Sequence, residues 1–241
     1  MTDMVIMPGS HYQAICDAVR AKTGGTDILK SGDLAAAIAG ISGGGASSED
    51  ALIARTLTSY TNTTAEEIGG YAFYNYKSLV SVDFPNVKKF TGSNNLMECR
   101  SLEAINFPKL EQASGGNAFR NCTSLKRVVL PRLCNAGISL DGCESLEFVD
   151  MGSEVAIEEV KGVFGTVQND VKLVTIILRY PKMITLLSVA KLSGTPIESG
   201  TGYIYVPSSL IVDYMEATNW VTFSQQFRAI EDYPEITGGA V

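Results

Sequence analysis

Residues 118–131 are Ala-Phe-Arg-Asn-Cys-Thr-Ser-Leu-Lys-Arg-Val-Val-Leu-Pro, and the Ser-Leu pair inside them recurs along the middle of the chain. The pairs stand at residues 78–79, 101–102, 124–125 and 145–146, in steps of 23, 23 and 21 residues. Apolar residues occupy the fourth and sixth positions after each serine, and proline follows in three of the four copies. Repetition at this period is the signature of a stacked-repeat architecture.

One unit of the repeat predicts a short strand. Leu79, Val82 and Phe84 form an apolar run whose last two members alternate with polar residues, and Pro85 ends it because proline cannot donate a ladder hydrogen bond. A unit of this size cannot bury its apolar positions alone, so we expect parallel stacking of the units. Each apolar position then packs on its copy in the next rung.

Five cysteines are present, and three of them share one position of the repeat, two residues before the serine. This position holds Tyr76, Cys99, Cys122 and Cys143. We expect the three cysteines to be stacked, buried thiols. A disulfide or a metal site remains an alternative, although three cysteines without a histidine are a poor ligand set. Cys16 and Cys134 lie outside the column and are expected to be structural.

With the copy at residues 72–79, Ala-Phe-Tyr-Asn-Tyr-Lys-Ser-Leu, this pattern resembles the BspA-type leucine-rich repeat. Such repeats occur in surface proteins of gut bacteria and protists, and in tail-region proteins of tailed phages that infect Firmicutes. The resemblance covers residues 66–152 and continues through a fifth strand at residues 172–178, after an insertion at 152–170. It implies an α+β fold, a leucine-rich-repeat solenoid of about five stacked parallel rungs, across residues 51–200.

The flanking segments predict three further parts. Residues 1–41 are expected to form a helical module, with a capping box at Ser10 and Gln13 and apolar residues at helical spacing. Residues 42–50 are expected to form a Gly/Ser linker. The helices resemble N-terminal segments of phage tail and fibre proteins, which implies attachment to the particle; a cap for the repeat stack is the alternative.

The C-terminal residues 201–241 predict a strand-helix cap. Residues 202–207, Gly-Tyr-Ile-Tyr-Val-Pro, are expected to form a strand, and a helical pattern begins at Ser208. Trp220, Phe223, Phe227 and Ile230 are expected to close the last rung. A solenoid needs such a cap because its final core face would otherwise meet water.

Composition excludes several classes of function. The chain has 241 residues, 45% of them hydrophobic, with 26 acidic against 19 basic residues and a net charge of −7. This balance argues against a nucleic-acid partner. His11 is the one histidine, and the sequence lacks GxSxG, P-loop, GxGxxG and HExxH motifs, so we predict no catalytic residue, no metal site, no cofactor and no enzyme activity. A carboxylate pair assembled in three dimensions, as in a glycan hydrolase, stays an alternative.

Binding residues are predicted on the outward side of the stacked strands. If Val82 points inward, Ser81 and Asp83 point outward, and the equivalent columns are Ala104, Arg127, Phe148 and Thr175, and Asn106, Val129, Asp150 and Ile177. The polar members, Ser81, Asp83, Asn106, Arg127 and Asp150, suit a glycan or a polar protein surface; a solvated face without a ligand is the alternative. Tyr71 and Tyr74 are further candidates, as exposed stacking residues.

The resulting hypothesis is a non-enzymatic, tail-associated phage protein. Its N-terminal helices would bind other tail proteins, and its repeats would bind a host-surface glycan or protein, or a neighbouring tail protein. The first eight residues, Met-Thr-Asp-Met-Val-Ile-Met-Pro, lack the pattern of a secretory signal, and no apolar stretch is long enough to span a membrane, so we expect a chain made in the host cytoplasm and located in the virion tail. The resemblance to tail fibres implies a homo-oligomer. The alternative is a leucine-rich-repeat adhesin on a bacterial cell surface.

Overall fold

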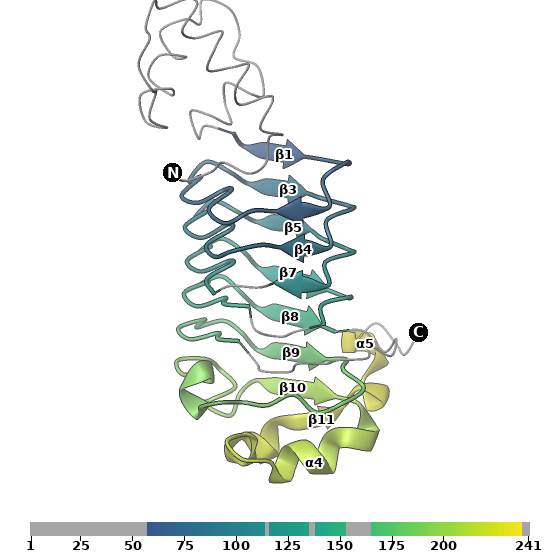
Figure 1. The fold of residues 1–241 in the computed structure, drawn as a ribbon. Helices are drawn as coiled ribbons and strands as arrows, with labels where there is room; N and C mark the ends of the chain where they lie inside the picture. Colours follow the sequence, from purple (N-terminus) through teal and green to yellow (C-terminus); the bar gives the residue numbers. More distant parts are fainter. Residues whose placement is uncertain (1–56, 114–115, 135–137, 153–164, 238–241) are drawn as a thin grey trace, which may run out of the picture.

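The computed structural model describes residues 57–113, 116–134, 138–152 and 165–237. Within them the chain winds into a solenoid whose parallel strands stack in a main column and a smaller one (Figure 1). The predicted helical module at 1–41, the linker at 42–50 and most of the insertion at 152–170 lie outside the described residues. No helix in the described ranges has the length and apolarity needed to cross a bilayer.

The main column holds one short strand from each turn of the solenoid. Its strands are β1 (Ser59–Thr61), β3 (Ser81–Asp83), β5 (Ala104–Asn106), β7 (Arg127–Leu130), β8 (Phe148–Met151), β9 (Thr175–Leu178), β10 (Tyr203–Val206) and β11 (Phe227–Ala229). Hydrogen bonds join β1-β3-β5 and β7-β8-β9-β10-β11 in parallel register, and β7 follows β5 in the same column (Figure 1). Six of these strands lie within residues 51–200, one more than predicted, because β1 precedes the first Ser-Leu pair.

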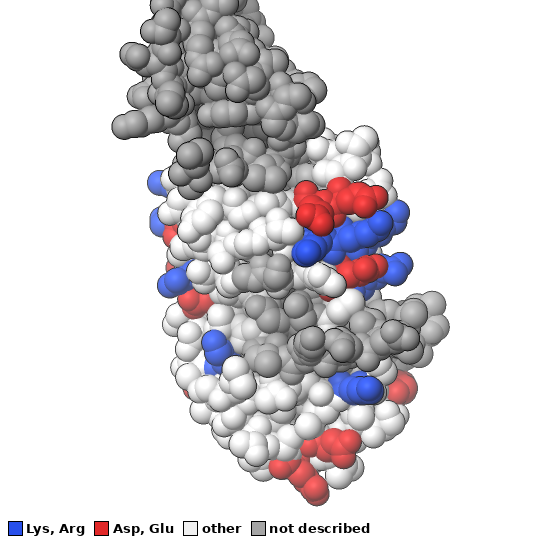
Figure 2. All heavy atoms as spheres, viewed as in Figure 1, with Lys and Arg blue, Asp and Glu red and all other residues white. Residues whose placement is uncertain are grey.

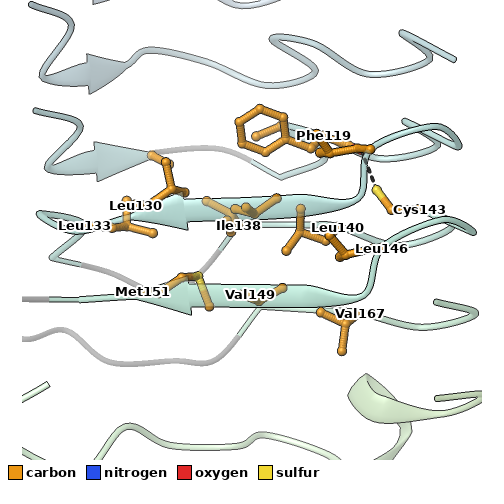
Figure 3. Close-up of a cluster of buried hydrophobic side chains, with 14 of the residues drawn as sticks. Phe119, Leu130, Leu133, Ile138, Leu140, Cys143, Leu146, Val149, Met151 and Val167 are labelled. Atoms are coloured by element: carbon orange, nitrogen blue, oxygen red, sulfur yellow. Dashed lines mark hydrogen bonds between the residues drawn. The ribbon is translucent and has the colours of Figure 1, made fainter. Parts of the chain in front are cut away.

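A second, smaller column runs along the other side of the core. It consists of β2 (Glu67–Ile68), β4 (Lys89–Phe90) and β6 (Gln112–Ala113), again parallel and in register. Ile68, Phe90 and Ala113 point inward and are buried. The core therefore lies between two strand columns. Figure 3 shows the side chains of β7 and β8 meeting Leu133, Ile138 and Leu140 from the opposite side of the coil.

Each turn of the solenoid passes through a left-handed residue just before the cysteine position. Asn75, Glu98, Asn121, Gly142, Asn169 and Gly194 all have positive φ. Asparagine and glycine adopt this conformation most readily, which explains why they occupy most of these positions.

The three cysteines of the repeat are buried and free, as predicted. The Sγ atoms of Cys99, Cys122 and Cys143 each donate to a backbone carbonyl oxygen of the preceding turn, at 3.0, 3.2 and 3.2 Å. Figure 3 shows the bond from Cys143 to Phe119. The same column continues, unpredicted, into Asp170 and Thr195, which are also buried. The cysteine column is thus one side-chain position that recurs in successive turns of the coil. From Cys99 to Thr195, the side chain at this position forms a hydrogen bond with a backbone group.

The C-terminal end carries short helices around the last two strands of the column. They are 3-10 helix η1 (Val189–Leu192), 3-10 helix η2 (Ser208–Leu210), helix α4 (Ile211–Glu216), 3-10 helix η3 (Trp220–Gln226), 3-10 helix η4 (Ile230–Asp232) and helix α5 (Pro234–Thr237). Trp220 Nε1 donates to the carbonyl oxygen of Ile184 at 2.7 Å, and the Ile184 N–H donates to the Tyr214 hydroxyl at 3.0 Å. The predicted helical pattern from Ser208 corresponds to η2, which begins at Ser208, and to α4, which follows it directly. Phe227 lies in β11, a strand that the sequence did not predict.

Candidate binding surface

The five predicted polar residues lie on one face of the main column. We call it the outward face: the solvent-side residues of β3, β5, β7 and β8, namely Ser81, Asp83, Ala104, Asn106, Arg127, Val129, Phe148 and Asp150. Register places Ser81 beside Ala104, Asp83 beside Asn106, and Arg127 beside Phe148. Because Val82, Val128 and Val149 between them are buried, their neighbours in sequence point outward.

Asp83 and Asn106 form a polar pair across the first two rungs of this face. Asn106 Nδ2 donates to Asp83 Oδ1 at 2.7 Å. Asn106 is exposed and Asp83 is half-buried, so the carboxylate has an amide partner and keeps a second oxygen toward solvent. The Asp83 carboxylate and the Asn106 side-chain carbonyl are both hydrogen-bond acceptors, which can bind hydroxyl or amide hydrogens of a partner.

Arg127 lies flat on its neighbour. Its guanidinium carbon is 3.7 Å from the ring centroid of Phe148, which is the next residue in the same column. A guanidinium over an aromatic ring is held by a cation–π attraction. In the described part of the chain, no carboxylate forms an ion pair with Arg127. The face therefore presents a positioned guanidinium whose edge is available to an acceptor.

Asp150 has a partner that the sequence did not reveal. Arg179, the residue after β9, donates from Nε to Oδ1 at 2.8 Å and from Nη2 to Oδ2 at 3.0 Å. Both side chains are only about 15% exposed. A ligand would therefore meet a neutralised bidentate pair at this rung rather than a free carboxylate.

The outward face ends where the C-terminal residues fold over it. Ile177 was predicted to point outward, and it lies on that side of β9, but it is fully buried. Tyr205 and Ile230 are buried against it, and Phe148 and Tyr233 pack on this cluster. Ile177 is covered because η4 and Tyr233, the residue after it, return to the solvent side of the strands. On β9 and β10 the outward side is thus only partly open: Ile177 and Tyr205 are covered, whereas Tyr203, in register with Thr175, is 37% exposed.

Tyr71 and Tyr74 are placed elsewhere, on the loop between β2 and β3. Their ring centroids are 5.7 Å apart with the planes at 78°, and Tyr71 is 48% exposed. Tyr76 occupies the cysteine column and is buried. The two tyrosines therefore do not belong to the outward face.

Charged side chains of both signs lie beside one another on the face shown in Figure 2. Among the described residues, exposed ion pairs join Lys88 to Glu66 at 3.4 Å and Arg132 to Glu111 at 3.1 Å. Such exposed pairs contribute little to stability. Their effect is to divide the surface into small patches of alternating sign.

The titratable groups with the largest shifts lie inside the core. Burial raises the pKa of the Cys99 thiol to about 12 and that of the Asp170 carboxyl to about 9. Asp170 Oδ1 accepts from the Cys143 N–H at 2.7 Å. No group of three or more metal-ligating side chains occurs among the described residues.

Comparison with known proteins gives the repeat its family. The description "BspA type Leucine rich repeat region" matches residues 54–160, in six copies. No curated protein matches the chain at a significant level. Among solved structures, the crystal structure of the T. pallidum leucine-rich repeat protein TpLRR is similar, with 21% identity over 58% of this chain and 70% of that chain, and a TM-score of 0.43. Residues 54–160 are thus similar to a BspA-type leucine-rich repeat region, and the strands described within them are parallel, with a step of 23 residues from β3 to β5.

Proposed function

We propose that the solenoid is a non-enzymatic binding domain and that its partner binds the outward face, which is formed by β3, β5, β7 and β8. Leucine-rich repeat regions are typically binding scaffolds. The observation that carries the proposal is Arg127, which lies on the Phe148 ring with its donors unpaired among the described residues. Because the surrounding strands are fixed by the core, the guanidinium is positioned before a partner arrives.

We further propose that the chain is a tail-associated protein of a tailed phage or prophage, with residues 1–41 attaching it to the particle. The support is the resemblance of this segment to N-terminal segments of tail and fibre proteins. In this proposal, the repeat region meets the host cell or a neighbouring tail protein. A cell-surface adhesin is the second candidate, because BspA-type repeats are also typical of that class.

The test uses the labelled full chain on intact candidate host cells, with phage adsorption followed in parallel. Saturable binding that blocks adsorption is expected for the wild type. Arg127→Gln should weaken binding about tenfold, the loss typical of one good interface contact. Lys89→Gln is the matched control, because it removes one positive charge from the second column, on the other side of the core.

Three results would contradict these proposals. Absence of binding to a strain that the phage readily infects would exclude the receptor-binding role. Equal affinities of Arg127→Gln and wild type would exclude the outward face as the binding surface. Absence of the chain from purified particles of the encoding phage would exclude the tail location. The adhesin alternative would then be favoured by detection of a longer, exported precursor.

A further inference from the structure

The loops between the two strand columns carry a second group of side chains that the outward face does not use. We call it the turn edge: Tyr71 and Tyr74 on the first rung, Asn94 and Met97 on the second, and Asn117 and Arg120 on the third. Backbone bonds fix this stacking, because Tyr71 N donates to Ser93 O at 3.0 Å and Asn94 N donates to Gly116 O at 3.1 Å. Asn75 N donates to Met97 O at 2.9 Å, which places Met97 below Tyr74.

Tyr71 has a backbone conformation that does not suit it. Its φ is 62°, in the left-handed region, and the equivalent residues of the next two rungs, Asn94 and Asn117, have φ of 61° and 65°. Asparagine tolerates this conformation, whereas a bulky side chain is an outlier there. The Tyr71 ring is also 48% exposed, so it is not explained by the core. A strained, exposed aromatic residue where the next two rungs have asparagine indicates a functional constraint.

The neighbours of Tyr71 supply an amide ladder. Asn117 Nδ2 donates to Asn94 Oδ1 at 3.1 Å, which orients both amides along the edge. In this orientation Asn94 retains its Nδ2 donor and Asn117 its Oδ1 acceptor, each without a partner in the described part of the chain. Beside them, the Tyr74 ring meets the Tyr71 ring edge-on, and Met97 is half-buried beneath. An apolar platform is thus bordered by one donor and one acceptor.

The nearby charges are paired with one another. Arg100 donates to Glu98 Oε2 from two nitrogens, at 2.8 and 2.9 Å, and Asn121 Nδ2 donates to Glu98 Oε1 at 2.6 Å. Arg120 forms an ion pair with Asp141 at 3.2 Å. The six residues of the turn edge therefore carry no unpaired charge among the described groups, and the one ammonium near them, Lys77, acts on the Glu98 carboxylate.

We propose that the turn edge of the first three rungs binds an uncharged saccharide, with one sugar ring stacked on the exposed Tyr71, which Tyr74 supports edge-on, and its hydroxyls bonded to Asn94 and Asn117. An apolar surface with a few placed polar groups is the usual composition of a small-ligand site. A sugar ring matches it, since one side presents C–H groups and the rim presents hydroxyls that both donate and accept. The site is separate from the outward face and does not depend on the function proposed for that face.

The test titrates the full chain with tetrasaccharides of glucose, galactose, mannose and N-acetylglucosamine by calorimetry. At least one should bind saturably to the wild type. Tyr71→Asn gives this rung the residue that the next two rungs have, so its melting temperature should equal or exceed that of the wild type while its affinity falls at least tenfold. Tyr203→Thr is the control, because it removes another exposed tyrosine, from β10, and should leave the affinity unchanged.

A second variant separates the amide from the backbone. Asn94→Gly keeps a residue that accepts the left-handed conformation and removes only the side chain, so it should weaken binding while Arg127→Gln does not. The proposal is overturned if none of the four tetrasaccharides binds, or if Tyr71→Asn binds as tightly as the wild type. Sugar binding that is lost in Arg127→Gln and kept in Tyr71→Asn would also overturn it, since the sugar would then lie on the outward face.

Discussion

At the residue scale, the cysteine column shows how one buried position closes each turn of the coil. Cys99, Cys122 and Cys143 are small and donate weakly to a carbonyl of the preceding turn. Asp170 enters the same position with a carboxyl group that is fully buried. Burial is the largest influence on it and raises its pKa to about 9, against the lowering effect of the Cys143 and Gly142 N–H bonds. The carboxyl group is therefore neutral in the folded chain at neutral pH.

A pH dependence of stability follows from the raised pKa of Asp170. In the unfolded chain this carboxyl loses its proton near its ordinary value of 3.8, whereas the folded chain keeps it up to about 9. The folded state binds more protons in that interval, so the contribution of Asp170 to stability is full below the lower value and is lost as pH rises to the upper one. Asp170→Asn, which is neutral throughout, should raise the melting temperature at pH 8 by several degrees and leave little gain at pH 4.

Thermal unfolding of both proteins between pH 4 and 9 measures this effect. Asp213→Asn is the control, because Asp213 is an exposed residue of α4. This control should follow the wild-type curve. A pH profile of Asp170→Asn parallel to that of the wild type would contradict a neutral Asp170 in the folded chain.

At the element scale, the strands that pack on copies of themselves are the ones that the repeat predicts. β3, β5, β7 and β8 carry the alternation in each copy, and β9 begins at Thr175 inside the predicted 172–178. The strands of the second column have two residues each, too few to show a period of two, and were not predicted. β1 was missed because no Ser-Leu pair precedes it.

The same reasoning explains how much of the surface could be predicted. Alternation placed Ser81, Asp83, Asn106, Arg127 and Asp150 on one face because it depends only on neighbours in sequence. Arg179 lies 29 residues from its partner Asp150, and no local pattern links them. The cover over Ile177 comes from Ile230 and Tyr233, which reach it only through the path of the C-terminal helices. Long-range contacts of this kind leave no periodic signal.

The left-handed residue of each turn gives a prediction at this scale. Gly142 has φ of 73°, and a Cβ added there would meet Asn121 Oδ1. Gly142→Ala should therefore lower the free energy of unfolding by at least about 1–2 kcal/mol, the cost of a left-handed conformation for a residue with a Cβ. Urea unfolding followed by circular dichroism measures the change.

Gly116→Ala is the matched control, because an added Cβ has nothing within 4 Å at that position and φ lies outside the left-handed region. This control should unfold as the wild type does. Equal midpoints for Gly142→Ala and Gly116→Ala would show that the turn relaxes without cost.

At the scale of the whole molecule, aromatic residues fill the core at both ends of the described stack. Phe73, Phe84, Phe90, Phe107 and Phe119 contact one another through the first rungs. Tyr214, Trp220 and Phe227 form a second group at the last rungs, with ring centroids 5.4–5.8 Å apart. The second group seals the core where the repeat sequence has ended.

Loss of the C-terminal seal should destabilise the stack. Trp220→Ala removes a buried side chain and leaves the carbonyl of Ile184 without its 2.7 Å bond, so we expect a loss of about 3–5 kcal/mol in unfolding free energy. Val221→Ala is the control, because Val221 is 51% exposed and changes little buried surface. Chemical denaturation compares the two, and similar midpoints would mean that the stack does not depend on this seal.

Because the backbone hydrogen bonds of the described rungs join each one to the rungs before and after it, tension applied to the two ends of the described stack acts on one interface at a time. A rung of 23 residues that detaches from the column releases about 80 Å of contour length, given roughly 3.3–3.6 Å for each extended residue. The neighbouring rungs keep their own ladders while this happens. A solenoid of this construction therefore lengthens in steps under load, and it absorbs work at each step before its last rung separates.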